Sequence, residues 1–216
     1  MSFNLNHLEF IAFASLWTIG LSAIAFVGGS IVGFGVALAR ISQHQWVRYV
    51  AATYIQLVQG TPLLILLFLI YFGVAIFGFN QVPAILAAGL GLTIYSSGFL
   101  AEIWRGCLES VPRTQWEAAE CLALTDWQRM QKVILPQAMR IATAPTVGFL
   151  VQIIKNTSLA SVVGFVELAQ AGKIINNSIF EPFTIFVVVA CFYFAICYPL
   201  SLWSRSLERK LNVGRR

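Results

Sequence analysis

The sequence predicts an all-α integral membrane protein with about five transmembrane helices and a two-helix loop on one side of the membrane. Two observations support this fold class. Hydrophobic residues make up 58% of the 216 residues and charged residues 11%, with a mean hydropathy of +0.78, a composition that soluble domains of this length do not show. The charged residues also leave long gaps, the longest of which run from Glu9 to Arg40 and from Arg48 to Glu102.

The apolar runs give the number of spans. A helix that crosses a bilayer needs about 20 apolar residues, so the first gap holds one span and the second gap holds two. Two further apolar runs follow in the C-terminal half of the chain. Five spans are expected, at about residues 10–39, 50–78, 84–104, 137–157 and 183–204. Because no polar linker divides them, residues 1–216 are expected to form a single transmembrane domain.

The first span has the features of a retained and closely packed helix. It is longer than the apolar core of a signal peptide and no basic region precedes it, so we expect it to remain as a span. Its glycines suit close contact with a neighbouring helix, because a missing side chain lets two backbones approach. These residues are Gly28, Gly29, Gly33 and Gly35.

The second span is interrupted by Gln59-Gly60-Thr61-Pro62. Pro62 lacks an amide hydrogen and Gly60 loosens the helix, which a membrane protein tolerates where the freed backbone groups face protein or a water-filled cavity. A broken span near the middle of the bilayer is the best indication of a transport site that a sequence offers. Gln59 and Thr61 are therefore candidate residues of a solute pathway.

The third and fourth spans carry polar side chains at a similar depth. Ser96 is the candidate in the third span, and Lys155, Thr157 and Ser158 are the candidates at the outer end of the fourth. A hydroxyl in a membrane helix usually bonds its own backbone, which makes a structural role the simpler interpretation for each hydroxyl. Lys155 differs, because a cation near or within a span is costly and marks function by default. Its alternative roles are an anchor at the outer interface and an ion pair with Glu167.

The segment from Arg105 to Arg140 is the longest charged stretch of the chain. Thr114-Gln115-Trp116-Glu117 and Thr125-Asp126-Trp127-Gln128 both have the form of a capping box, in which a hydroxyl and a Glu or Gln side chain bond the amides of a helix start. They predict two short helices with a bend between them, near Ala123-Leu124. At the beginning of this stretch, Glu102 and Arg105 are spaced for an ion pair on one helix face.

The basic residues indicate which loops face the cytoplasm. Under the five-span arrangement twelve of the fourteen lie on one side, whereas Lys155 and Lys173 fall on the other. The positive-inside rule then places the N-terminus outside and the C-terminus in the cytoplasm. The net charge of +5 follows from this orientation, and nucleic acid is not an expected partner, because no basic stripe is interleaved with aromatic residues. The twelve residues are Arg40, Arg48, Arg105, Arg113, Arg129, Lys132, Arg140, Arg205, Arg209, Lys210, Arg215 and Arg216.

Two other classes of function fit the sequence less well. A membrane-embedded enzyme needs catalytic groups at one depth, yet His7 and His44 lie at an end and in a loop, and the spans hold no pair of carboxylates. We expect no catalytic site, and no metal site either, because the four cysteines form no C-x-x-C pair. A passive channel would explain the polar residues at mid-depth but gives the two-helix loop no role.

Several motifs resemble the polar amino acid permeases of ABC importers, the group for histidine, glutamate, glutamine, arginine and opines. Glu117-Ala118-Ala119, followed by Ala123 and then by Val133, Leu135 and Pro136, has the spacing of that family's cytoplasmic loop signature. The usual Gly of the signature is Ala123 here, and because Ala resists the positive φ that Gly permits, we expect a tighter or shifted bend. The other matching segments are Gln59-Gly60-Thr61-Pro62-Leu63-Leu64, Ala101-Glu102-Ile103-Trp104-Arg105-Gly106, Ser110-Val111-Pro112, Leu135-Pro136-Gln137-Ala138 and Lys155-Asn156-Thr157-Ser158-Leu159.

The resemblance covers nearly the whole chain and implies an ABC importer type I permease fold. It implies a multi-pass subunit of the bacterial inner membrane that takes up a polar amino acid, with an opine or another small polar solute as the alternative. The implied partners are an ATPase dimer that carries the ATP and Mg²⁺, a second permease subunit, identical or similar, and an external solute-binding protein, besides membrane lipid. The chain itself has no G-x-x-x-x-G-K-[ST] phosphate loop and is expected to bind no cofactor.

The resemblance also implies roles for the candidate residues. The cytoplasmic loop would enter a cleft of the ATPase, where the Glu117 carboxylate meets a polar rim and the small Ala119 lets the helix seat closely. A solute with an α-carboxylate and an α-ammonium would meet the pathway candidates, with Lys155 as the partner of the carboxylate. The loop residues are Glu117, Ala118, Ala119, Ala123, Leu135 and Pro136, and the pathway residues are Gln59, Thr61, Ser96, Lys155, Thr157 and Ser158.

Overall fold

A computed structural model describes residues 3–76 and 83–213 of the chain. Within these ranges every regular element is a helix, which confirms the all-α fold class. The elements are α1 (Leu5–Arg40), α2 (Gln45–Gly60), α3 (Leu63–Ile76), α4 (Ala84–Glu109), α5 (Arg113–Cys121), α6 (Asp126–Arg129), the π-helix η1 (Met130–Ile134), α7 (Leu135–Asn156), the 3₁₀-helix η2 (Thr157–Val163), α8 (Leu168–Ile179) and α9 (Pro182–Val213).

The structure contains the expected spans but breaks one of them sharply. Helices α1, α4 and α9 and the helical run Asp126–Val163 are each long and apolar enough to cross a membrane, and the pair of α2 and α3 makes a fifth candidate bent by 103°. The helices continue beyond most of the expected limits, because backbone hydrogen bonding does not stop where the hydrocarbon ends. Positions 77–78 of the second expected span lie outside the described residues, as do Arg215 and Arg216 of the tail.

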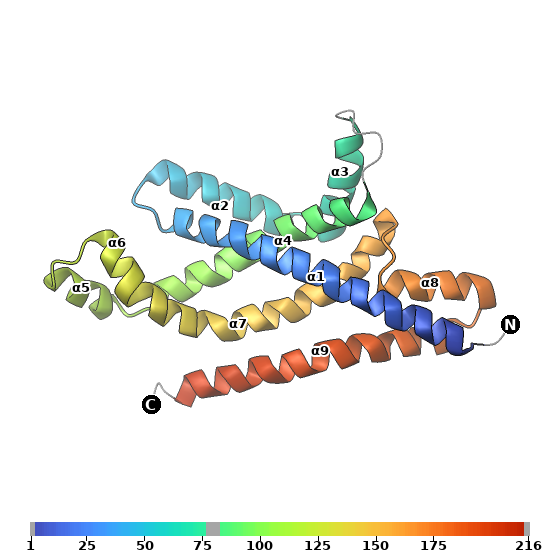
Figure 1. Cartoon of the computed structure of the whole chain (residues 1–216). Helices are drawn as coiled ribbons and strands as arrows, with labels where there is room; N and C mark the ends of the chain where they lie inside the picture. Colours follow the sequence, from blue (N-terminus) through green and yellow to red (C-terminus); the bar gives the residue numbers. More distant parts are fainter. Residues whose placement is uncertain (1–2, 77–82, 214–216) are drawn as a thin grey trace.

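The long helices run beside one another along the length of the molecule (Figure 1). The short helices α5 and α6 lie at one end, together with the connection between α1 and α2 and the C-terminal end of α9. The N-terminus and α8 lie at the opposite end, and α3 stands at a steep angle to the other helices. The loops that carry most of the basic residues therefore share one end of the bundle.

Helices α1 and α4 meet along a seam of small residues. A Cβ atom added to Gly29 would lie 2.6 Å from Ser96 Cβ, and one added to Gly33 would lie 2.8 Å from the carbonyl oxygen of Ser97. Gly28 is similarly close to Thr93. The packing predicted for the glycines of the first span is thus confirmed for three of them and wrong for Gly35, which points into open space.

The seam leads to a prediction with a matched control. Gly29→Ala should lower the free energy of unfolding by about 1–3 kcal/mol, because the new methyl group overpacks the contact with Ser96. Gly35→Ala introduces the same methyl group on the same helix without a clash, and should stabilise the helix by up to about 1 kcal/mol. Equilibrium unfolding of both variants in detergent measures the difference. Equal stabilities would contradict the seam.

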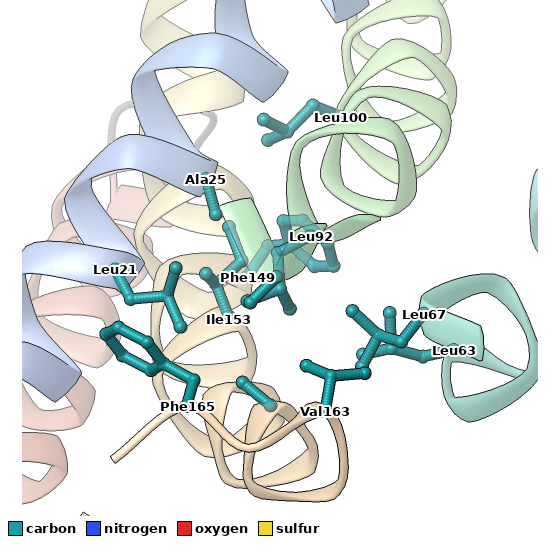
Figure 2. Close-up of a cluster of buried hydrophobic side chains, with 12 residues drawn as sticks. Leu21, Ala25, Leu63, Leu67, Leu92, Leu100, Phe149, Ile153, Val163 and Phe165 are labelled. Carbon is teal, nitrogen blue, oxygen red and sulfur yellow. The ribbon is translucent and has the colours of Figure 1, made fainter. Parts of the chain in front are cut away.

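The largest hydrophobic cluster joins the spans behind this seam (Figure 2). Leu21 from α1 and Leu92 from α4 meet Phe149 and Ile153 from α7, while Leu67 of α3 reaches the cluster from the far side of the bend. The steep angle of α3 is therefore fixed by packing. The remaining labelled residues are Ala25, Leu63, Leu100, Val163 and Phe165.

Candidate functional site

The break between α2 and α3 is the first element of the site. Helix α2 ends at Gly60 and Thr61 is extended, with φ −103° and ψ 127°. The Thr61 hydroxyl donates to the carbonyl of Leu57 at 2.7 Å, so it bonds the freed backbone of its own helix. Gln59 instead reaches the neighbouring helix, where its amide donates to the carbonyl of Gly98 at 3.4 Å. The sequence-based interruption is confirmed, and Gln59 is the side chain that it directs toward α4.

The polar residues of α4 belong mostly to helix packing. Ser96 is fully buried in the contact with α1, and its hydroxyl has no hydrogen-bond partner among the described residues. The neighbouring Ser97 hydroxyl lies 2.5 Å from the Tyr54 hydroxyl of α2 and also donates to the carbonyl of Ile94. The hydrogen bond between Tyr54 and Ser97 joins α2 to α4 nearly two helical turns before the break.

The end of α7 presents one cation and several self-bonded hydroxyls. Thr157 and Ser158 donate to the carbonyls of Ile154 and Lys155 in the preceding turn, as a structural role requires. Lys155 is exposed, and no ion pair to it occurs among the described residues, so the alternative pair with Glu167 is not formed.

The six pathway candidates therefore form three groups. Gln59 and Thr61 lie at the end of α2, Ser96 lies in the α1–α4 seam, and the other three lie where α7 meets η2. Within residues 3–76 and 83–213, no side-chain hydrogen bond or ion pair links one group to another.

Glu167, which the sequence analysis considered only as a possible partner of Lys155, is a buried carboxylate that joins α8 to α9. Glu167 is fully buried and begins α8, where its carboxylate accepts from the amides of Ala169 and Gln170, both at 2.9 Å. It also accepts from the hydroxyl of Tyr193 on α9 at 2.7 Å. The adjacent Leu168 amide donates to Thr18 of α1. A Glu directly before a helix was the available signal, since this is a capping position.

Burial sets the protonation behaviour of this carboxylate. Loss of solvent raises the pKa of Glu167 above its ordinary value, although the three donors and the charge of Lys173 act in the opposite direction. Lys173 itself donates to the hydroxyl of Ser161 in η2 at 2.9 Å. Glu167 and Lys173 thus connect α8 to α9 and to η2.

The loop at the opposite end folds as two short helices and a corner. Helix α6 starts with the predicted capping box of Thr125 and Gln128, which is confirmed by both of its hydrogen bonds. The other predicted capping box is wrong. Pro112, already fixed near φ −53°, precedes a helix that begins at Arg113, so Thr114 lies inside the first turn and does not cap it.

The corner itself is formed by Ala123. Its φ is +53°, so this alanine adopts the left-handed conformation that the signature's glycine would permit. The bend is where the sequence placed it, and the expected shift away from positive φ did not occur. Tertiary contacts across the corner hold a conformation that costs an L-residue about 1–2 kcal/mol.

Arg129 holds the two loop helices together. Its guanidinium pairs with Asp126 of α6 at 2.7 Å and with Glu120 of α5, and it lies 5.6 Å from the ring centroid of Trp116. Its side chain is only 13% exposed. Gln43 in the α1–α2 connection also donates to Asp126, which ties a second loop to the same corner.

The signature residues occupy different places in this loop. Glu117 and Ala118 are exposed, but Ala119 is 2% exposed and is buried within the chain itself. The expectation that Ala119 seats in a partner's cleft is therefore corrected, because its methyl group is not available at the surface. The π-helix η1 ends at Ile134, and Leu135 and Pro136 form the first turn of α7 directly after it. Pro136 has no amide hydrogen, which a helix tolerates in its first turn.

The ion pair predicted between Glu102 and Arg105 is confirmed, and Arg105 additionally pairs with Glu109 one turn later. In the described part of the chain, no group of three or more His, Cys, Asp or Glu side chains is placed to hold a metal ion.

Comparisons with known proteins decide the family. Residues 29–213 match the model of the binding-protein-dependent transport system inner membrane component. The chain belongs to this family. The permease is 37% identical over 194 residues to the probable amino-acid ABC transporter permease protein YckA of Bacillus subtilis (strain 168), covering 90% of this chain and 85% of the relative. It is 32% identical over 195 residues to the probable glutamine ABC transporter permease protein GlnM of the same organism, with 90% of each chain covered.

A solved structure gives the same result for the fold. The permease superposes on a chain of an amino acid ABC transporter crystallised with histidines with a TM-score of 0.90 and 30% identity. The match covers 97% of this chain and 100% of that chain. The type I permease fold expected from the motifs is therefore confirmed.

Proposed function

We infer that this permease is the membrane-spanning subunit of an ABC importer for a polar amino acid, in the inner membrane. The observation that carries this conclusion is the structural likeness, at 30% identity and over 97% of the chain, to an amino acid ABC transporter. The curated relatives named for amino acids support the same solute class. One relative is named for glutamine and the solved transporter was crystallised with histidines. These two similarities therefore do not identify the side chain of the solute.

Three kinds of protein partner are proposed for this chain. ATP hydrolysis with Mg²⁺ is assigned to a separate ATPase dimer, and delivery of the solute to an external binding protein. A second permease subunit, identical or similar, is assigned to the exposed face of α7. Pro145, Gly148, Gln152 and Lys155 recur there every three or four residues and are all exposed. An amide and an ammonium on a spanning helix do not face lipid, so this stripe fits a partner subunit or an aqueous path.

The loop of α5, α6 and η1 is assigned to contact with the ATPase. Glu117 and Ala118 are exposed on α5 and are proposed to touch it directly. Ala119 is proposed to act from inside, since it lets α5 pack closely on the rest of the permease. Ala123 sets the corner between the helices. Leu135 and Pro136 are proposed to connect the loop to α7 through the π-helix.

The pathway residues divide by what their polar atoms are free to do. Gln59 and Lys155 are proposed to meet the solute, because Lys155 has no ion-pair partner in the described residues and Gln59 makes one long hydrogen bond. Thr61, Thr157 and Ser158 bond their own helices, so they are proposed to shape the path. Ser96 is buried against Gly29, so its proposed role is in the packing of α4 against α1.

Lys155 provides a test of solute contact. Lys155→Met keeps the length of the side chain and removes its charge, so uptake should fall about tenfold if the ammonium binds the solute carboxylate. The yield of the assembled transporter should not change, because the side chain is exposed and unpaired in the described residues. Lys155→Arg, which keeps the positive charge at the same position, is the control. Unchanged uptake in Lys155→Met would assign this residue to the interface with lipid.

The proposed orientation places the N-terminus outside and the C-terminus in the cytoplasm. It rests on the twelve basic residues of the first loop, the α5–α6 loop and the tail. A reporter fused after Arg216 should be active only as a cytoplasmic reporter, and one inserted near Asn80 only as an external one. The opposite pattern would place the α5–α6 loop outside the cell, where it could not contact a cytoplasmic ATPase.

Uptake into proteoliposomes that hold the permease with its ATPase and binding protein tests the function itself. Labelled solute should accumulate only with ATP, and an inactive ATPase should abolish uptake, whereas a passive channel would continue to equilibrate the solute. A competition series of basic, acidic and amide amino acids, with an opine as the alternative cargo, identifies the solute. Uptake that no amino acid or opine inhibits would contradict the proposed solute class.

A further inference from the structure

A small polar cavity lies between α1, α2 and α4 in the half of the bundle near the α5–α6 loop. Its volume is about 140 Å³, well above the roughly 10–15 Å³ that one water molecule needs. It extends from Arg40 at the end of α1 to Gln59, the residue before Gly60 at the break. The residues that line it are Arg40, Ala52, Ile55, Gln56, Gln59 and Glu102.

Two oppositely charged side chains line this cavity and form no ion pair with each other among the described residues. Arg40 and Glu102 have opposite charge, yet no ion pair within 4.0 Å joins them in the described part of the chain. The Nε atom of Arg40 is buried and has no hydrogen-bond partner among the described residues. Glu102 is bound on one side by Arg105, but a carboxylate can accept about four hydrogen bonds, so it retains free acceptor sites.

An unpaired buried guanidinium donor is costly, and nearby carboxylates are its best acceptors. Here Glu102, the acidic side chain of the lining, forms no ion pair with Arg40 among the described residues, and the same cavity is lined by Gln56 and Gln59, whose amides both donate and accept. A guest with a negative group at one end and a positive group at the other matches this arrangement. The α-carboxylate and α-ammonium of an amino acid form such a guest.

We propose that this cavity is an inner binding site for the zwitterionic head of an α-amino acid, separate from any contact at Lys155. The carboxylate of the solute lies against Arg40, and its ammonium lies against Glu102 and the amide of Gln59. The C-terminal end of α2 is close by at Gly60 and favours the positive group at that side. The identity of the guest rests on the proposed function, whereas the charge pattern of the cavity does not.

The position of the site gives it a role late in transport. Arg40 belongs to the end of α1 that shares a side with the α5–α6 loop (Figure 1). Under the proposed orientation this is the cytoplasmic side. A solute that leaves the break between α2 and α3 would stop here before release, and solute from the cytoplasm would reach the same site.

Glycine is the probe for this site, because it is the smallest molecule with both charged groups. Inside-out membrane vesicles expose the cytoplasmic side of the assembled permease. A Gln56→Cys variant, with the four native cysteines replaced, is labelled by a methanethiosulfonate reagent. Glycine at about twice its dissociation constant should slow labelling about threefold. Acetate and methylammonium, each with one of the two groups, should leave the rate nearly unchanged.

Two cavity variants and one control variant complete the test. Arg40→Gln should abolish protection by glycine, and Ala52→Leu, which fills the cavity and keeps the charge, should do the same. Val50→Leu on the exposed face of α2 should retain protection. Equal protection by acetate would mean an anion site and overturn the zwitterion. No protection by glycine, or protection that survives both cavity variants, would overturn the site. The assay needs neither ATP nor transport, so these results are independent of the uptake measurement that tests the proposed function.

Discussion

The Glu167→Ala permease is expected to lose about 3 kcal/mol or more of its free energy of unfolding. The substitution leaves the amides of Ala169 and Gln170 and the hydroxyl of Tyr193 without their common acceptor. Each buried donor without a partner costs about 1–3 kcal/mol, and the loss of a helix cap is part of that sum. Thermal unfolding of the purified protein in detergent should show a large decrease in melting temperature.

Glu167→Gln is the matched variant, because its amide oxygen still accepts from Gln170 and its nitrogen can donate to the Tyr193 oxygen, although the Ala169 amide then loses its acceptor. Its free energy of unfolding should therefore lie between those of Glu167→Ala and the unmodified permease. Burial raises the pKa of Glu167 in the folded state, so its stabilising contribution is full below about pH 4.3, the ordinary pKa of Glu, and is lost as pH rises through the raised value.

The pH series therefore has a defined sign. From pH 4.3 upward the unmodified permease should lose stability relative to Glu167→Gln, with Lys173 and Tyr193 as the other titratable groups around the carboxylate. Two parallel curves across this range would mean that Glu167 titrates normally, and a stable Glu167→Ala variant would mean that it is not the acceptor that holds α8 to α9.

The second large effect is expected at the loop corner, and it rests on the proposed contact with the ATPase. Arg129→Met should reduce ATP-driven uptake about tenfold while the permease remains inserted. In the two lost ion pairs the carboxylate side chains of Glu120 and Asp126 are exposed to solvent. Each pair therefore contributes roughly 0.2–1 kcal/mol. The contact with Trp116 adds about 0.5–1 kcal/mol. A sum of about 1.4 kcal/mol changes the equilibrium constant for the correct loop conformation tenfold, and a tenfold loss of uptake follows if that conformation is only marginally favoured.

Lys132→Met is the control, since it removes a basic side chain that is exposed in the adjacent π-helix. Uptake, ATP hydrolysis stimulated by the loaded binding protein, and co-purification of the ATPase should be measured for both variants. A selective loss of stimulated hydrolysis in Arg129→Met supports a fixed corner. Equal values for the two variants would show that the loop keeps its shape without the guanidinium.

The features that the sequence predicted correctly depend on near neighbours in the chain. The capping box of Thr125 and Gln128, the ion pair of Glu102 and Arg105 and the break at Pro62 all involve residues within four positions. The second capping box failed for an equally local reason, because Pro112 started the helix two residues early. Local chemistry is therefore readable, although a competing signal one or two residues away changes the result.

The features that were missed depend on contacts between distant segments. Glu167 accepts a hydrogen bond from Tyr193, and the adjacent Leu168 amide donates one to Thr18, both on helices far away in the chain. The bend of 103° between α2 and α3 is set by where Leu63 and Leu67 pack, which Pro62 alone does not determine. Ala123 adopts φ +53° in a corner across which Arg129 pairs with Glu120, a contact between two helices that the local sequence does not reveal. The individual residues of the candidate site remain predictions, and their separation into three groups could not be predicted from the sequence.

The close seam of α1 and α4 limits how the subunit can move. Gly29 and Gly33 leave no side-chain layer between the two backbones, so sliding one helix along the other would drive a Cα into Ser96 or Ser97. The pair should therefore travel as one rigid body, and shear between them is disfavoured. Any rearrangement that opens one side of the membrane and closes the other must be absorbed elsewhere. The break at Gly60 and Thr61 interrupts the helix backbone, but Leu67 of α3 packs into the central cluster, so we expect α3 to move together with α1 and α4.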